Sequence, residues 1–188
     1  VSAGTYYENI VWPETNGIQL IGSGEDDCII DGNQQGSVIR FEEELGGIID
    51  ITTLITGFTI TNGYAHDNNE FGDWENMLGG GILCWNSNPT LTNLIITGNS
   101  AEDEGGGVFC KDSNPTLTNI LITGNSASQG AGICCRYSSP NLENVTISDN
   151  SGYNGGAFWL DSSIPSLVNC ILWNNDSPQI YIQTGSLN

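Results

Sequence analysis

The sequence "GGGILCWNSNPTLTNLIITGNSA", residues 79–101, is followed by a near copy, "GGGVFCKDSNPTLTNILITGNSA", at residues 105–127. Two further copies, "GAGICCRYSSPNLENVTISDNSG" and "GGAFWLDSSIPSLVNCILWNNDS", begin at residues 130 and 155. The period is therefore 25 or 26 residues, and the copies align without internal gaps. Because so short a unit cannot bury its own apolar face, successive units must stack on one another.

Each copy contains short apolar or alternating runs, separated by Gly, Asn, Pro or Ser, which is typical of strands and turns. About 25 residues divided among three strands and three turns predict one coil of a parallel β-solenoid, with coils about 4.8 Å apart. We expect one all-β domain over residues 1–188 with roughly six to seven coils. Its parts would be irregular coils over 1–78, an acidic insertion at 64–78 and regular repeats over 79–176.

Aligning the copies places like residues in columns. The apolar columns predict the core, and two asparagine columns predict sharp turns, since Asn tolerates left-handed backbone and its amide can bond the neighbouring coil. The apolar columns are Ile82, Val108, Ile133, Phe158; Cys84, Cys110, Cys135, Leu160; Leu91, Leu117, Leu142, Leu167; and Ile96, Ile122, Ile147, Leu172. The asparagine columns are Asn93, Asn119, Asn144, Asn169 and Asn99, Asn125, Asn150, Asn175, which we interpret as structural.

The repeat pairs "GGGI…ITGN", "GGGV…ITGN", "GAGI…ISDN" and "GGAF…LWNN" resemble the GG[AI]…xxxN repeats of polymorphic outer membrane proteins. Those repeats belong to the right-handed parallel β-helix, or pectin-lyase-like, superfamily. The opening "AGTYYENIVW…GIQLIGSGEDDCIIDG" is similar to the first coils of many such chains, pectin esterases among them. The resemblance implies a right-handed parallel β-helix, a fold that hosts lyases, hydrolases, esterases and adhesins alike.

Six cysteines accompany the repeats. Stacked residues on parallel strands point side by side rather than toward each other, which is poor disulfide geometry. We therefore expect reduced, packed thiols, with Cys84, Cys110 and Cys135 directed inward and Cys134 directed outward. Cys170 falls in the column of Leu94.

The formal charge of −19, from 22 acids and three cations, argues against nucleic acid or anionic lipid as a partner. No apolar run is long enough to insert this segment into a membrane. We expect a monomer. The chain starts abruptly and ends in mid-pattern, so we expect it to be part of a longer protein whose targeting signal lies elsewhere.

Catalysis in the superfamily would use an outward strip along one sheet. The candidates there are few: Lys111, Arg136 and Asp161 share a column with Trp85, and Asp112 follows Lys111. Two carboxylates at a suitable separation would suffice for a glycosidase. However, the chain lacks the arginine motif of the lyases, the aspartate pair of the pectin esterases and the histidine loop of the hydrolases. These departures favour a non-catalytic role over an enzyme, and a polysaccharide lyase or glycoside hydrolase stays the alternative.

Aromatic residues fall on or beside the same strip, and flat exposed rings commonly stack on sugars or anchor a partner protein. An equally weighted alternative is that the rings cover neighbouring coils or pack under the insertion. The candidate ligand-binding residues are Trp74, Trp85, Phe109, Tyr137 and Trp159.

Two acidic loops leave the solenoid at one corner, "HDNNEFGDWEN" at 66–76 and "EDE" at 102–104. Clustered carboxylates attract a hard cation such as Ca²⁺, although most such runs are solvated turns. The candidate calcium ligands are Asp73, Glu75, Glu102, Asp103 and Glu104. No other cofactor is expected.

We predict a non-catalytic domain of a secreted or cell-surface bacterial protein, serving as a stalk or as an adhesin-like platform for a glycan or a cell-surface protein. The first alternative is a polysaccharide lyase or glycoside hydrolase with its cleft along the aromatic strip. The second is a structural spacer without a ligand.

Overall fold

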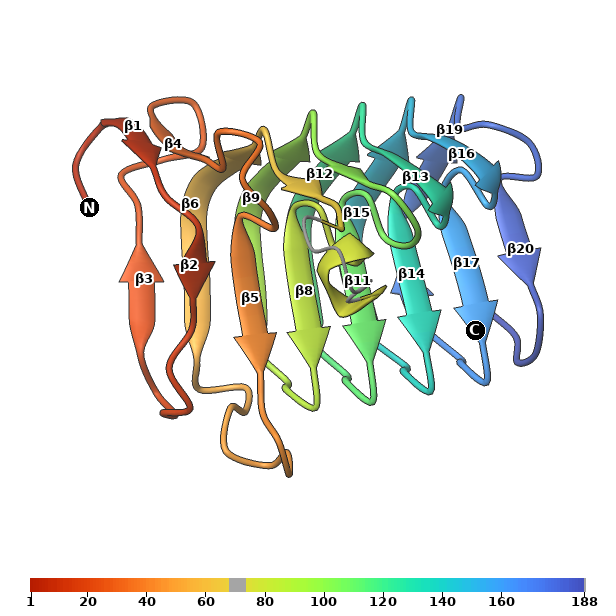
Figure 1. Ribbon diagram of the computed structural model, residues 1–188, viewed down its shortest axis with the longest axis horizontal. Coiled ribbons are helices and arrows are strands. Elements are labelled where there is room, and N and C mark those ends of the chain that lie inside the picture. The colour runs from red at the N-terminus through yellow and green to blue at the C-terminus, as the bar shows by residue number, and fades with distance from the viewer. Residues whose placement is uncertain (68–73, 188) are drawn as a thin grey trace.

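The computed structural model describes residues 1–67 and 74–187, and in that part the chain winds into a parallel β-solenoid of about seven coils (Figure 1). Three parallel sheets form its walls, which confirms the predicted all-β architecture with three strands per coil. Besides these strands, the described residues form one short 3₁₀ helix, η1 (Trp74–Met77).

Sheet A is the longest wall, and most of its strands pair in sequence order of the coils. β3 joins it by pairing with β6, and β19 joins it by pairing with β15. Its strands are β1 (Gly4–Tyr7), β3 (Gln19–Ile21), β4 (Cys28–Asp31), β6 (Leu54–Thr61), β9 (Thr90–Thr97), β12 (Thr116–Thr123), β15 (Asn141–Ser148), β18 (Ser166–Val168) and β19 (Ile171–Trp173).

Sheets B and C complete each coil. Sheet B contains β2 (Ile10–Val11), β5 (Ile39–Glu42), β8 (Ile82–Trp85), β11 (Val108–Lys111), β14 (Ile133–Arg136), β17 (Phe158–Asp161) and β20 (Ile180–Ile182). Sheet C is shorter and contains β7 (Tyr64–Ala65), β10 (Ser100–Ala101), β13 (Ser126–Gln129) and β16 (Ser151–Asn154).

The predicted register is confirmed. Val108 pairs with Ile82 on one side and Ile133 on the other, and Phe158 pairs with Ile133. These columns are buried and form one continuous core through the solenoid. All six cysteines are free, as predicted, and all are buried except Cys170, which is half-buried.

The two asparagine columns have different structural roles. Asn93, Asn119, Asn144 and Asn169 have φ between 50° and 55°, and the exposed amides bond one another at 3.1–3.3 Å. This left-handed residue interrupts the inward–outward alternation of the long sheet A strands and so bends them. The second column is buried, and the Nδ2 groups of Asn99, Asn125 and Asn150 each donate to Oδ1 of the next asparagine at 2.9–3.1 Å.

A buried serine column was not predicted. The backbone N–H groups of Ser87, Ser113 and Ser138 each donate to Oγ of the serine in the following coil, at 3.0–3.1 Å, ending at Ser163. The signal was present in the repeat, because a serine stands at the same position of every copy. The column satisfies buried backbone donors at the turn that leaves sheet B.

Candidate functional site

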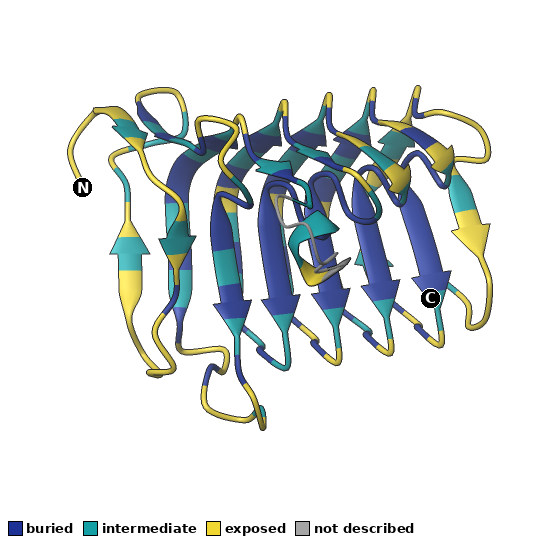
Figure 2. Ribbon diagram, in the orientation of Figure 1, coloured by how far each residue is buried: buried dark blue, intermediate teal, exposed yellow. Residues whose placement is uncertain are grey.

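The middle of the outer face of sheet B is buried rather than exposed. Leu83, Phe109, Cys134 and Trp159 lie side by side on consecutive strands and form a second hydrophobic cluster, which Leu78 also joins. Figure 2 shows these strands as almost entirely buried. The expectation that Phe109 and Trp159 present exposed rings is therefore wrong. Their column packs beneath other side chains, which is the alternative that the sequence left open.

Glu104 is also buried, at the corner beside this cluster. Its carboxylate forms an ion pair with Arg136 from the next coil, and Cys134 Sγ donates to Oε2 at 3.4 Å. Burial raises the pKa of Glu104, and the bond and charge of Arg136 offset part of that rise. Burial and then the charge of Glu104 raise the pKa of Cys134 well above its usual range, so this thiol is not a nucleophile.

The candidate catalytic groups on the outward column are engaged with neighbours. Arg136 is held by Glu104 and lies 5.2 Å from the ring centroid of Trp159. Lys111 Nζ lies 3.7 Å from the ring centroid of Trp85. Asp161 accepts a hydrogen bond from Ser162 Oγ at 3.2 Å. An arginine fixed by a buried carboxylate is a poor general base, so this column offers an aromatic and charged wall rather than acid–base machinery.

Asp112 and Tyr137 occupy the turn that follows sheet B. Asn86, Asp112, Tyr137 and Ser162 stand at one position in four successive coils, and all have φ between 50° and 54°. Asn and Asp adopt this left-handed conformation readily, whereas a tyrosine does so rarely. Asp112 is therefore explained by the turn, and the exposed Tyr137 occupies a position whose backbone favours Asn.

The acidic corner is divided among different partners. Glu102 accepts from Tyr64 Oη at 3.0 Å and from the Asp67 N–H at 3.3 Å, while Glu104 faces Arg136. The alternative interpretation of "EDE" as a solvated turn is thus wrong for Glu104, which is buried. Among the described residues, no three His, Cys, Asp or Glu side chains lie close enough together to hold a metal ion. Glu75 lies on η1 near Asn76, whereas Asp73 and the side chain of Trp74 lie outside the described part, so the full calcium set stays a prediction.

Sheet C carries a groove that the sequence did not predict. The groove has a volume of about 700 Å³ and runs across β10, β13 and β16 to the following turn. Small residues of successive coils hollow it out, serine hydroxyls line it, and Tyr153 stands at its edge with 85% of its surface exposed. Glu102 and Asp176 lie at its two ends. The signal in the sequence was a set of small columns: Ser100, Ser126, Ser151 and Ala101, Ala127, Gly152.

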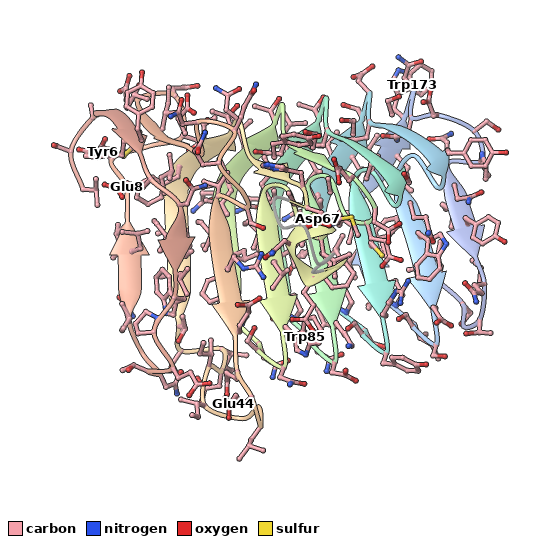
Figure 3. The ribbon with its side chains drawn as sticks, viewed as in Figure 1. Tyr6, Glu8, Glu44, Asp67, Trp85 and Trp173 are labelled. Atoms are coloured by element: carbon pink, nitrogen blue, oxygen red, sulfur yellow. The ribbon has the colours of Figure 1, made fainter. Side chains whose placement is uncertain are left out.

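A second hollow, here called the acidic hollow, lies beside β5 of sheet B. It has a volume of about 520 Å³, and its lining includes Glu14, Glu42, Glu44, Glu75 and Trp85. The predicted ligand residue Trp85 is half-buried here, at the last position of β8 (Figure 3). Arg40 also lines the hollow and pairs with Glu42.

Comparison with known proteins defines the class. The chain matches the family described as the right handed beta helix region over residues 90–188, more than half of its length. It therefore belongs to the right-handed β-helix family, as its repeats and its three parallel sheets require. No curated protein and no solved structure gives a significant match. The finer likeness to polymorphic outer membrane protein repeats stays a resemblance. In the described part, no helix is long and apolar enough to cross a membrane.

Proposed function

We propose that this chain is a non-catalytic β-helix domain of a secreted or cell-surface bacterial protein that binds a glycan chain in the groove along sheet C. The β-helix fold fits a structural or binding domain, and the groove is the observation that favours binding. It runs along the solenoid over several coils, as an extended polymer requires.

The chemistry of the groove suits a hydroxyl-rich ligand. Ser126, Ser128 and Ser151 provide hydroxyl groups on neighbouring strands, and hydroxyls both donate and accept hydrogen bonds. Tyr153 provides a flat ring at the edge, where it can stack on the apolar face of a sugar. Glu102 and Asp176 accept hydrogen bonds at the ends and disfavour acidic sugars, so we expect a neutral or amino glycan.

The absence of catalysis is supported by the state of the candidate groups. Arg136 is paired with Glu104, and Lys111 lies on Trp85. Asp112 occupies a structural turn. None of these described groups faces the sheet C groove, so binding there would not place a substrate against them.

The test is binding and turnover on one panel of oligosaccharides: neutral glucans, chitin fragments, pectin and alginate, with and without Ca²⁺. We expect calorimetric binding without product release, and we expect Tyr153→Ala to weaken it. Tyr137→Ala is the matched control, because Tyr137 is an exposed tyrosine outside the groove. Product release abolished by Asp161→Asn or Arg136→Gln would establish an enzyme instead. The absence of both binding and turnover would favour a structural spacer without a ligand.

A further inference from the structure

We propose that the loop over residues 43–52, here called the Leu45 loop, docks a partner protein that offers an apolar pocket flanked by basic side chains. The loop joins β5 to β6 and projects beyond the ends of the sheet B strands (Figure 1). It exposes 98% of Leu45, 67% of Ile51 and 43% of Ile48. Apart from Tyr137 and Tyr153, the other exposed large apolar side chains of the described part lie in the first and last coils.

The Leu45 loop is fixed in place by a buried carboxylate. Glu43 is only 4% exposed, and its two oxygens accept the N–H groups of Ile49 and Ile48 at 2.6 and 2.7 Å. Asn86 Nδ2 donates to the Glu43 carbonyl at 2.9 Å, and Ile49 is buried in the core. Leu45 is therefore held outward by a braced frame. A pre-formed apolar contact of this kind loses little entropy when it is buried by a partner.

Glycine at the tip is required by the same geometry. Gly46 has φ of 72°, and a Cβ atom there would lie 3.1 Å from the Asn86 carbonyl oxygen. Both the left-handed backbone and this tight approach to the neighbouring coil favour a residue without a side chain. The turn directs Leu45 away from the core, where a leucine would otherwise be more stable.

The acidic hollow adjoins the Leu45 loop and gives the charge of the partner. Glu44, which Figure 3 labels, directly precedes Leu45. It lines the hollow together with Glu14 and Glu75. Arg40 balances only Glu42, so the hollow keeps a net negative charge. The acidic groups alone would fit any cation. The fixed apolar residues beside them narrow the occupant to a protein surface that combines apolar and basic groups.

A basic side chain is already stable against this wall. Lys111 Nζ lies over the ring of Trp85, which lines the acidic hollow. Because Lys111 covers the ring, an ammonium or guanidinium group of the partner would meet the carboxylates of the hollow. The Leu45 loop lies at the opposite ends of the coils from β10, β13 and β16 (Figure 1). The proposal is thus independent of glycan binding, and either can fail without the other.

The test uses a fluorescent 14-residue peptide of alternating leucine and lysine, with binding measured by anisotropy. We expect binding to weaken at least about tenfold in the double variant Leu45→Ser/Ile51→Ser, because apolar anchors dominate such interfaces. Tyr7→Ser is the matched control, since it removes a similarly exposed apolar side chain elsewhere, 68% exposed on β1. All these positions are exposed, so folding is preserved.

A second pair of variants tests the charge. Glu44→Gln/Glu75→Gln should weaken binding several-fold, and more at low salt than at high salt. Asp26→Asn/Asp27→Asn makes the same change of charge at an exposed turn far from the loop and should leave binding unchanged. If both test variants bind like their controls, the peptide senses only the overall negative charge and the proposal is overturned.

Two further experiments test whether the Leu45 loop instead contacts a second copy of the chain or a membrane. Sedimentation without peptide would reveal a dimer that depends on Leu45, which would assign the loop to a second copy of the chain. Flotation with phosphatidylcholine vesicles would reveal membrane contact that depends on Leu45. Either result would overturn the proposal that the loop docks a protein with basic side chains. We expect a monomer in the first experiment and no flotation in the second.

Discussion

Sheets B and C are built from the same repeat, yet their outer faces differ. On sheet B, Phe109 and Trp159 lie in a buried cluster, and the charged column beside them is engaged in ion pairs and ring contacts. On sheet C, the corresponding outward positions carry serine, and Tyr153 extends into solvent. The comparison shows that an outward strip stays open to solvent only where small residues leave room above it.

The largest expected effect tests whether the outer cluster of sheet B is a true core. Phe109→Ala should destabilise the protein by about 3–5 kcal/mol, because it removes a buried ring and leaves a cavity. Tyr153→Ala on sheet C should change stability by less than about 0.5 kcal/mol, since that side chain is exposed. Urea unfolding of both variants measures the difference. Equal effects would mean that the two faces do not differ.

The next effect tests the ion pair beneath the sheet B face. Arg136→Met should cost about 2–3 kcal/mol at pH 7, because the buried Glu104 charge loses its partner and Arg136 is itself partly exposed. The pKa of Glu104, already raised by burial, would rise further, so the folded state would bind a proton that the unfolded state does not. The loss should therefore shrink as the pH falls from 7 toward 5.

The control for this pH dependence is the double variant Glu104→Gln/Arg136→Met, which removes both charged groups of the ion pair. As the pH falls, the single variant should regain more stability relative to the wild type than the double variant does. Unfolding midpoints measured at pH 5, 6 and 7 suffice. A single variant whose deficit is constant over that range would contradict a buried, charged Glu104.

A moderate effect tests the open face. Tyr153→Ala should weaken binding of a glycan by about tenfold, as expected for an aromatic contact at an exposed edge. Ser151→Ala should weaken it less, by roughly 0.5–1.5 kcal/mol for one hydrogen bond. Calorimetry with the tightest oligosaccharide of the panel provides the measurement. Unchanged affinity in Tyr153→Ala, beside a loss in Tyr137→Ala, would move the ligand to the sheet B rim.

The smallest effect concerns Tyr137 at the rim of sheet B. Tyr137→Asn should stabilise the protein by roughly 0.5–1 kcal/mol, because asparagine tolerates the left-handed backbone at this turn. The equivalent change Ser162→Asn, one coil further on, is the matched comparison. Thermal unfolding at neutral pH would reveal the shift, and destabilisation by Tyr137→Asn would mean that the tyrosine ring makes a stabilising contact.

The repeat allowed the columns to be predicted because each coil pairs in register with the next. Ile82, Val108 and Ile133 had to stack once the period was known, and so did the asparagines. The burial of Phe109 could not be predicted in the same way, because it depends on what lies outside the coil rather than on the period. The repeat correctly predicts that the Phe109 side chain points outward from the coil. It does not predict that the side chain is buried there.

Glu104 shows a second limit. It belongs to an irregular acidic stretch between repeats, and its partner Arg136 lies in the following coil. No column contains both residues, so the pairing follows only from how the corner folds. The groove on sheet C was within reach of the sequence, because columns of serine, alanine and glycine are visible there. Small residues also form turns, so their columns do not by themselves distinguish a turn from a groove.

The buried asparagines form a chain of amides with one direction. The bonds between side chains run toward the C-terminal end, from Asn99 through Asn125 and Asn150, and the last amide, Asn175, donates to Gln179 Oε1 at 3.3 Å. Each Nδ2 group also donates to a backbone carbonyl of the coil before it. Aligned hydrogen bonds polarise one another, so each amide strengthens its neighbours. Losing Asn99, Asn125 or Asn150 would weaken two junctions between coils together, whereas losing Asn175 would weaken only the junction with the coil before it. The ladder therefore couples adjacent coils into one cooperative unit, and unfolding should start at an end of the solenoid.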